Sequence, residues 1–138
     1  MANNKYVDFI IRITQQTKDK KLNWRYLDTN KALYEGMGWV NTRPQLALFS
    51  PDREVKTPNF NQENSFCTCV DGMFIVLYVW YDEPAKMFVI PDTYKKVVTL
   101  LPDEYGEHIT KLLNLVQSQF PNAESFIDNY LSKSDNQG

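Results

Sequence analysis

Two cysteines and one histidine are the side chains in this sequence most suited to metal or redox chemistry, and their spacing limits what they can do. Cys67 and Cys69 are two residues apart, so on a strand both thiols point to the same face. A structural zinc site needs four ligands, but there is no second cysteine pair and His108 is far along the chain. Neighbours at this spacing on a strand also form a poor disulfide. We interpret both cysteines as small buried residues and expect neither a metal nor another cofactor.

Acid–base catalysis is not favoured by the titratable residues either. His108 lies on a predicted helix between Glu104 and Lys111, a polar surface neighbourhood that offers no positioned catalytic partner. The carboxylates of Asp82 and Glu83 fall at a predicted turn, where contact with water leaves little desolvation to shift a pKa. The sequence also contains no phosphate-binding glycine loop, no G-x-S-x-G and no H-E-x-x-H. We therefore do not expect an enzyme.

Aromatic residues are the unusual feature of the composition, with eight Phe, eight Tyr and three Trp. Most must form the core, yet not all can, because several rings are amphipathic and two of these lie near predicted turns. Exposed Trp and Tyr are enriched where proteins bind proteins. The candidate partner-binding residues are Trp39, Phe60, Trp80, Tyr81, Asp82 and Glu83. This hypothesis requires an aromatic patch to remain exposed.

A central strand positions these side chains. Asp71-Gly72 predicts a two-residue hairpin turn, because both positions of such a turn favour positive φ. The nine residues of Met73–Tyr81 include no charge, Pro or Gly, and both alternating sets are apolar. A strand of this kind is buried on both faces of a sheet. Strands at 65–70 and 86–90 complete a predicted three-strand antiparallel meander.

Helices are predicted before and after this meander in the sequence. Apolar residues at helical spacing indicate a first helix over 5–18 and another over 103–119, which begins at Pro102 and Asp103. After Pro121 a last helix is expected, and its apolar residues are predicted to pack inward. These residues are Phe126, Ile127, Tyr130 and Leu131.

Several shorter segments are less regular. Alternation over 22–26 indicates a short strand, and a helical turn is expected over 31–35 with Thr29 or Asn30 as its cap. Peripheral strands are expected at 39–40 and 45–49, on either side of Pro44. Residues 50–64 read as a long polar loop, which either connects elements or contacts a partner. The pattern of residues 93–101 suits either a helix or a strand. Apolar residues at the spacing i, i+3, i+4, i+7 favour the helix.

The order of these elements predicts the α+β class. An antiparallel sheet with its central meander at about 65–90 should carry an N-terminal helix and C-terminal helices packed on it. The 138 residues suggest a single domain over 1–138, with a frayed polar tail at 133–138.

The charge balance limits the classes of partner. A net charge of −2 and a pI of about 5.4 provide no electrostatic drive toward nucleic acid or an anionic membrane. No stretch reaches the roughly 18–20 apolar residues that span a bilayer, and the N-terminus does not read as a signal peptide. With two cysteines and no export signal, we expect a cytoplasmic protein.

The chain resembles small uncharacterised α+β proteins of Gram-positive bacteria and their mobile elements. The matching features are the early helix DFIIRITQQTKDKKLNW, the meander around SFCTCVDGMFIVLYVWY and MFVIPD, and the ending LLNLVQSQFPNAESFIDNYL. They cover most of the chain and are structural rather than functional motifs. The resemblance therefore implies a fold and carries over no functional residue.

These observations favour a non-catalytic protein-binding module of an inhibitor, immunity-type or regulatory kind. The basis is a likeness in general character, because proteins of these kinds are often small, mildly acidic and without catalytic motifs. The alternative is a small-molecule-binding domain, or an enzyme with an unrecognised pocket site. Nucleic-acid binding through Lys18, Lys20, Lys21 and Arg25 ranks third, since the overall charge does not support it. The oligomeric state stays open.

Overall fold

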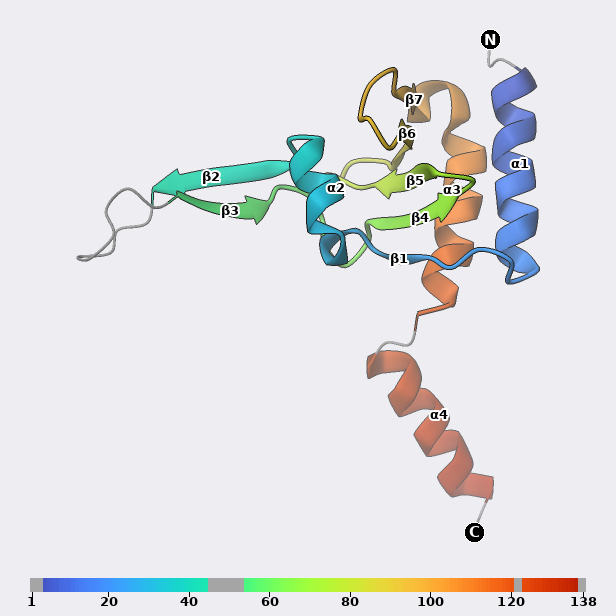
Figure 1. Ribbon diagram of the computed structural model, residues 1–138. Coiled ribbons are helices and arrows are strands. Elements are labelled where there is room, and N and C mark those ends of the chain that lie inside the picture. The colour runs from blue at the N-terminus through green and yellow to red at the C-terminus, as the bar shows by residue number, and fades with distance from the viewer. Residues whose placement is uncertain (1–3, 45–53, 121–122, 137–138) are drawn as a thin grey trace.

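The computed structural model of this protein describes the chain except residues 1–3, 45–53, 121–122 and 137–138 (Figure 1). It confirms the α+β class. The helices are α1 (Asn4–Lys18), the 3-10 helix η1 (Leu27–Thr29), α2 (Lys31–Gly36), α3 (Pro102–Ser118) and α4 (Ala123–Asn136). The strands are β1 (Arg25–Tyr26), β2 (Val40–Pro44), β3 (Glu54–Pro58), β4 (Phe66–Val70), β5 (Met73–Tyr78), β6 (Lys86–Pro91) and β7 (Val98–Leu100).

Five strands form the main sheet, in the order β1-β4-β5-β6-β7 and antiparallel throughout. The predicted meander is its centre. Val70 pairs with Met73 around the two-residue turn, where Asp71 and Gly72 have φ values of 49° and 79°. These positive φ values are the reason why this dipeptide suits the turn. β5 ends at Tyr78, three residues before the predicted end of the strand.

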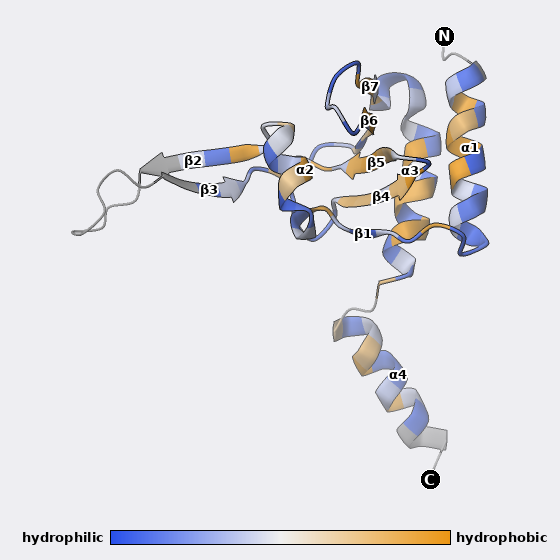
Figure 2. Ribbon diagram, in the orientation of Figure 1, coloured by the Kyte–Doolittle hydropathy of each residue, from blue (hydrophilic) through white to orange (hydrophobic). Residues whose placement is uncertain are grey.

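The central strand β5 is buried on both faces, as its lack of alternation predicts. Ile75 and Leu77 pack into the core cluster beneath α1 and α3, whereas Val76 and Tyr78 pack into a second cluster on the opposite face. Figure 2 shows hydrophobic residues concentrated on β4, β5 and the two long helices. The sheet is therefore the middle layer of the molecule.

The predicted helices α1 and α3 lie side by side over one face of the sheet (Figure 1). Ile10 and Ile13 of α1 meet Ile109 and Leu112 of α3 in the first core cluster. Pro102 opens α3 at a position where its missing N–H is not needed.

Smaller elements cover the other face. Asn30 caps α2, because its side-chain oxygen accepts a hydrogen bond from the Leu33 N–H at 3.1 Å. Leu33 and Tyr34 of α2 then pack with Phe60 and the β5 side chains. Gly36 lets the Tyr94 ring approach closely, since a Cβ at that position would lie 3.0 Å from the ring.

Three segments differ from the sequence predictions. Residues 93–101 contain the strand β7 and no helix, because Val98 and Leu100 pair with β6 and the preceding Lys96 has φ of +58°. Part of the predicted loop at 50–64 is the strand β3, which pairs with β2 in a separate two-stranded ribbon. The predicted strand at 22–26 shortens to the two residues of β1, and the one predicted at 45–49 lies outside the described residues.

The last helix, α4, exists as predicted but does not bury its apolar residues. It projects away from the end of α3 (Figure 1), and Phe126, Ile127, Tyr130 and Leu131 are 49–66 % exposed. The prediction that they pack inward is wrong, because α4 lies beyond both layers that cover the sheet. The helix continues to Asn136, into the segment that the sequence predicts as a polar tail. None of the described helices is long and apolar enough to cross a membrane.

A buried hydrogen-bond chain ties α1 to the segment that follows it. The Trp24 indole N–H donates to the Thr17 hydroxyl at 2.9 Å, and that hydroxyl donates to the Ile13 carbonyl at 2.8 Å. Thr17 is fully buried and Trp24 is 5 % exposed, so no bulk water replaces either bond.

Thr17→Val is expected to lower the free energy of unfolding by about 1–3 kcal/mol, since it leaves the buried indole N–H without an acceptor. Urea unfolding measures the change. Thr14→Val is the matched control, because the half-buried Thr14 hydroxyl bonds only to the Ile10 carbonyl among the residues that the structure describes. Equal stability of the two variants would contradict the assigned role of Thr17.

Candidate functional site

The structure divides the predicted aromatic contacts between core and surface. Phe60 is 5 % exposed and Trp39 is half-buried, with its ring 4.8 Å from that of Tyr78 and 4.9 Å from that of Phe88. Both belong to the packing on the second face of the sheet. The expectation that Phe60 offers an exposed contact is therefore corrected, because covering β5 on this face requires that side chain.

Trp80 and Tyr81 remain on the surface, at the turn between β5 and β6. They are 43 % and 58 % exposed, and their rings meet edge-on with centroids 4.9 Å apart. Tyr81 has φ of +53°, a left-handed conformation that is uncommon for a bulky residue. Such strain persists only where the surroundings enforce it, and it is often found at functional sites.

The buried Ser65 and the half-buried Asn61 hold this turn in place. The Ser65 hydroxyl accepts from the Val79 N–H at 3.0 Å and donates to the Val79 carbonyl at 3.3 Å. The backbone N–H of Asn61 also donates to the Val79 carbonyl, at 2.8 Å, and its side-chain amide donates to the Tyr81 carbonyl at 3.5 Å. The exposed rings therefore stand on a well-anchored backbone.

Asp82 and Glu83 complete the turn as exposed carboxylates. Among the residues that the structure describes, neither forms an ion pair. Burial, followed by the charges of nearby Tyr81 and Glu83, raises the pKa of the Tyr78 phenol beneath the turn. The surface from Trp80 to Glu83 thus combines two aromatic rings with two negative charges that are not neutralised there. We call these four residues the WYDE turn.

The cysteines have different environments, although both lie on β4. Cys67 is buried as expected, whereas Cys69 is exposed, and both are free thiols. Burial is the main cause that raises the pKa of Cys67 to about 11, so its thiol is protonated and unreactive at neutral pH. No group of three or more metal-ligating side chains gathers anywhere in the described part of the chain.

His108 is half-buried on α3.

A recess beside β1 brings together residues that the sequence did not single out as a site. Its floor is the aromatic trio Tyr26, Phe66 and Phe120, with ring centroids 4.7–5.1 Å apart. Glu63, Asn64 and Gln117 line its polar side, and the Gln117 amide donates to the Asn64 side-chain oxygen at 2.9 Å. The cavity measures about 510 Å³. The only sequence signal was the long polar loop, because three separate segments converge here through the fold.

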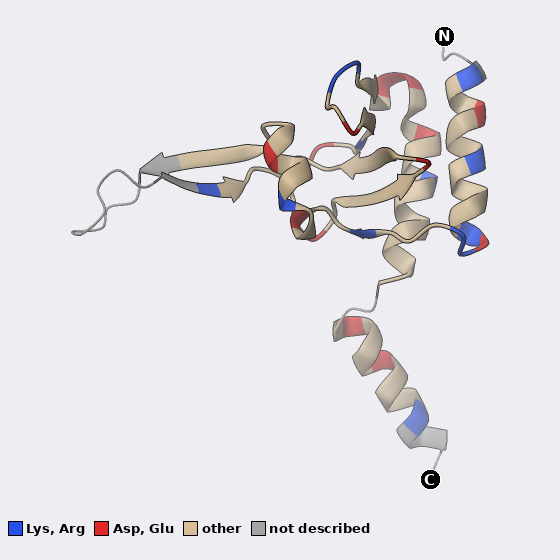
Figure 3. Ribbon diagram, in the orientation of Figure 1, with Lys and Arg blue, Asp and Glu red and all other residues tan. Residues whose placement is uncertain are grey.

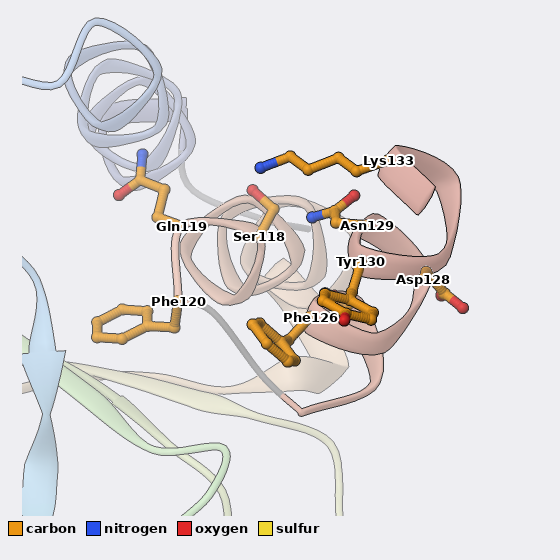
Figure 4. Close-up of a pocket in the computed structure, with 9 residues that line it drawn as sticks. Ser118, Gln119, Phe120, Phe126, Asp128, Asn129, Tyr130 and Lys133 are labelled. Atoms are coloured by element: carbon orange, nitrogen blue, oxygen red, sulfur yellow. The ribbon is translucent and has the colours of Figure 1, made fainter. Parts of the chain in front are cut away.

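A larger open space of about 700 Å³ lies between the end of α3 and α4 (Figure 4). The rings of Phe126 and Tyr130 stack on each other with centroids 6.1 Å apart, and Phe120 lies on the α3 side. Ser118, Asn129 and Lys133 lie on the other side of this space, away from the rings. Its polar groups do not converge with its aromatic ones, so this space lacks the arrangement of a small-molecule site.

No protein-family model, curated protein or solved structure matches this chain.

The raised pKa of Cys67 has a consequence for stability at alkaline pH. The unfolded chain loses this proton near the ordinary value of 9.0 and the folded chain near 11. The folded state therefore binds more protons between these values, and stability falls as the pH rises from about 9 to about 11. Urea midpoints measured across this range should fall less steeply in Cys67→Ala than in the wild type. Cys69→Ala, at an exposed position, should keep the wild-type slope, and an unchanged slope in Cys67→Ala would contradict the assignment.

Proposed function

We propose that this protein is a non-catalytic protein-binding module of an inhibitor, immunity-type or regulatory kind, acting in the cytoplasm on a protein partner through the WYDE turn. The observation that carries the proposal is the exposed, edge-packed ring pair of Trp80 and Tyr81 on an anchored turn. Trp and Tyr are the residues most enriched among those that dominate binding energies at protein interfaces.

The way the turn is held supports this proposal. An interface residue that is already ordered loses less conformational entropy when its partner binds. The hydrogen bonds from Ser65 and Asn61 fix the backbone at Val79 and Tyr81, and each ring restrains the other. The left-handed backbone at Tyr81, with φ of +53°, sets the direction in which its exposed ring leaves the turn.

The charges of the turn favour a partner whose surface is basic. Asp82 and Glu83 lie next to the rings and lack cationic partners within the described chain. Complementary charge across an interface accelerates association and orients the two proteins, and this effect weakens as salt increases.

The first test is affinity capture from a lysate of the organism that encodes the protein. The double variant Trp80→Ala/Tyr81→Ala should lose a stoichiometric partner, because truncating each interface hot spot costs about 2 kcal/mol or more, roughly a thirtyfold change in affinity. Met73→Ala is the matched control, since Met73 is also 43 % exposed but lies at the opposite hairpin turn. Capture that survives the double variant, or that is lost equally with Met73→Ala, would contradict the proposal.

A second measurement on the captured complex tests the charges. Asp82→Asn/Glu83→Gln should slow association and flatten its dependence on salt, while leaving the dissociation rate nearly unchanged. Surface plasmon resonance at two ionic strengths separates these rates. An unaltered salt dependence would show that these two carboxylates do not take part in the interface.

The recess beside β1 supports a second candidate function, small-molecule binding. An aromatic floor with a few convergent polar groups is the composition of many ligand pockets. A thermal-shift screen of metabolites should then give a compound whose stabilisation disappears in Gln117→Leu and Asn64→Leu, and persists in Trp80→Ala/Tyr81→Ala. If no compound raises the melting temperature, or if the recess variants keep the full shift, this candidate fails.

A further inference from the structure

The recess beside β1 adjoins a second cavity. This cavity, of about 620 Å³, shares Tyr26 and Glu63 with the recess and is also lined by Asp28, Asn61 and Gln62. The recess itself, with about 510 Å³, already has the size of a small-molecule pocket. Because the two cavities have walls in common, one ligand can contact both. We call the two cavities together the extended recess.

The charged side chains of the extended recess are all negative. Glu63 lines both cavities and Asp28 lines the second, and no Lys or Arg is found among the described residues that line either one. Figure 3 shows negative residues on η1 and on the loop before β4, and a positive residue on β1. That residue, Arg25, pairs in register with Cys67 and lines a different cavity. Within the described chain neither carboxylate forms an ion pair. A bound cation would therefore find charges that are not yet neutralised.

A second acceptor lies in the same cavity as Glu63. The Gln117 side-chain N–H donates to the Asn64 side-chain oxygen at 2.9 Å, which leaves the Gln117 carbonyl oxygen without a partner among the described residues. Ammonium and guanidinium groups carry only donors, three and five respectively. A carboxylate together with an unused carbonyl oxygen is thus a set of acceptors suited to either group.

The aromatic floor favours the same class of ligand. Tyr26 and Phe120 are half-buried, whereas Phe66 is 1 % exposed, so the first two rings present their surfaces to the recess. The face of an aromatic ring is partly negative and attracts a cation, and its carbon surface packs against methylene groups. An anionic ligand would instead meet ring faces and carboxylates of its own sign.

The walls of the extended recess are held by hydrogen bonds of the protein itself. On the loop side, the Asn61 N–H donates to the Val79 carbonyl at 2.8 Å, and the Glu63 N–H donates to the Asn61 side-chain oxygen at 3.1 Å. On the helix side, the Gln119 side-chain N–H donates to the Thr17 carbonyl at 2.9 Å and ties the end of α3 to α1. A site that is ordered in advance loses less entropy when a ligand binds.

We propose that the extended recess binds a small organic cation that carries its positive group on an apolar stem. Glu63 and the Gln117 carbonyl oxygen hold an ammonium or guanidinium group. The stem packs on the rings of Tyr26 and Phe120. Asp28, in the adjoining cavity, takes a second positive group, so the preferred ligand is a linear diamine. This inference rests on the second candidate function, small-molecule binding in the recess, and adds the chemical class of the ligand.

NMR titrations of the labelled protein test the class with compounds that share one stem length and differ in charge: pentylamine, pentanol and pentanoate. Pentylamine should shift the resonances of Glu63 and the Gln117 side-chain amide, and cadaverine, the corresponding diamine, should bind about fivefold more tightly. Pentanol or pentanoate binding as tightly as pentylamine would overturn the cationic class and keep the recess as a small-molecule site. Absence of binding by all four compounds and by every compound of the metabolite screen would remove both.

Two isosteric variants test the carboxylates. Glu63→Gln should weaken pentylamine about fivefold, and Asp28→Asn should remove the advantage of cadaverine over pentylamine. Glu107→Gln is the matched control, because Glu107 is an exposed carboxylate of α3 that lines neither cavity. Since Glu63 is exposed, Glu63→Gln should keep the wild-type urea midpoint, which separates lost binding from lost folding. Unchanged pentylamine affinity in Glu63→Gln would overturn the proposal.

A lysine with acetylated amino and amidated carboxyl ends distinguishes a free diamine from a basic side chain of a protein partner. It should bind more weakly than cadaverine, because it has a neutral backbone where the diamine has its second charge. Tighter binding of the blocked lysine would overturn the diamine and assign the extended recess to a protein side chain. Trp80→Ala/Tyr81→Ala should bind cadaverine as the wild type does, since neither ring lines the extended recess. Loss of a protein partner in that variant is therefore independent of this site.

Discussion

Burial of β5 on both faces is the constraint on which the rest of the structure depends. Its apolar side chains alternate between two core clusters, so neither side of the sheet can face water. Each fully buried side chain of this kind contributes about 1.5–3 kcal/mol relative to an exposed one. The long helices α1 and α3 cover one face, and α2, η1, Trp39 and Phe60 cover the other. The α+β architecture follows because each of the two faces of β5 needs its own covering layer.

The same constraint explains which surfaces remain available for binding. Val79 continues β5 into the turn, and its bonds to Ser65 and Asn61 anchor the backbone that carries Trp80 and Tyr81. The backbone of the turn is therefore held by the strand that is buried on both faces, while the Trp80 and Tyr81 side chains lie outside the core. By contrast, α4 comes after both layers are complete, and its apolar face has no core left to join. Trp80 and Tyr81 are thus exposed on an anchored turn, whereas the apolar face of α4 is exposed because both faces of the sheet are already covered by other elements.

The candidate site shows how far local patterns can be taken. Trp39, Phe60, Trp80 and Tyr81 were equivalent by type and by proximity to turns or polar segments. Only the placement of Trp39 and Phe60 against Tyr78 made them part of the core, since the second face of β5 required large side chains there. The recess of Tyr26, Phe120 and Glu63 could not be predicted, because it unites a short strand, a helix end and a loop that are distant in sequence.

By itself, the sequence determined the elements whose signals are local: the Asp71-Gly72 turn, the doubly buried strand after it, the meander and two helices. These helices were predicted over 5–18 and 103–119 and lie within one residue of those bounds, over 4–18 and 102–118. Their periodicity and turn residues specify backbone conformation without reference to distant segments. Only the tertiary structure decided that Val98–Leu100 is a strand, since pairing with β6 settles a pattern that suits either state. It also decided that Cys69 and the apolar face of α4 are exposed. An apolar pattern states that a surface can be buried, but burial requires a partner, and only the arrangement of the other elements provides one.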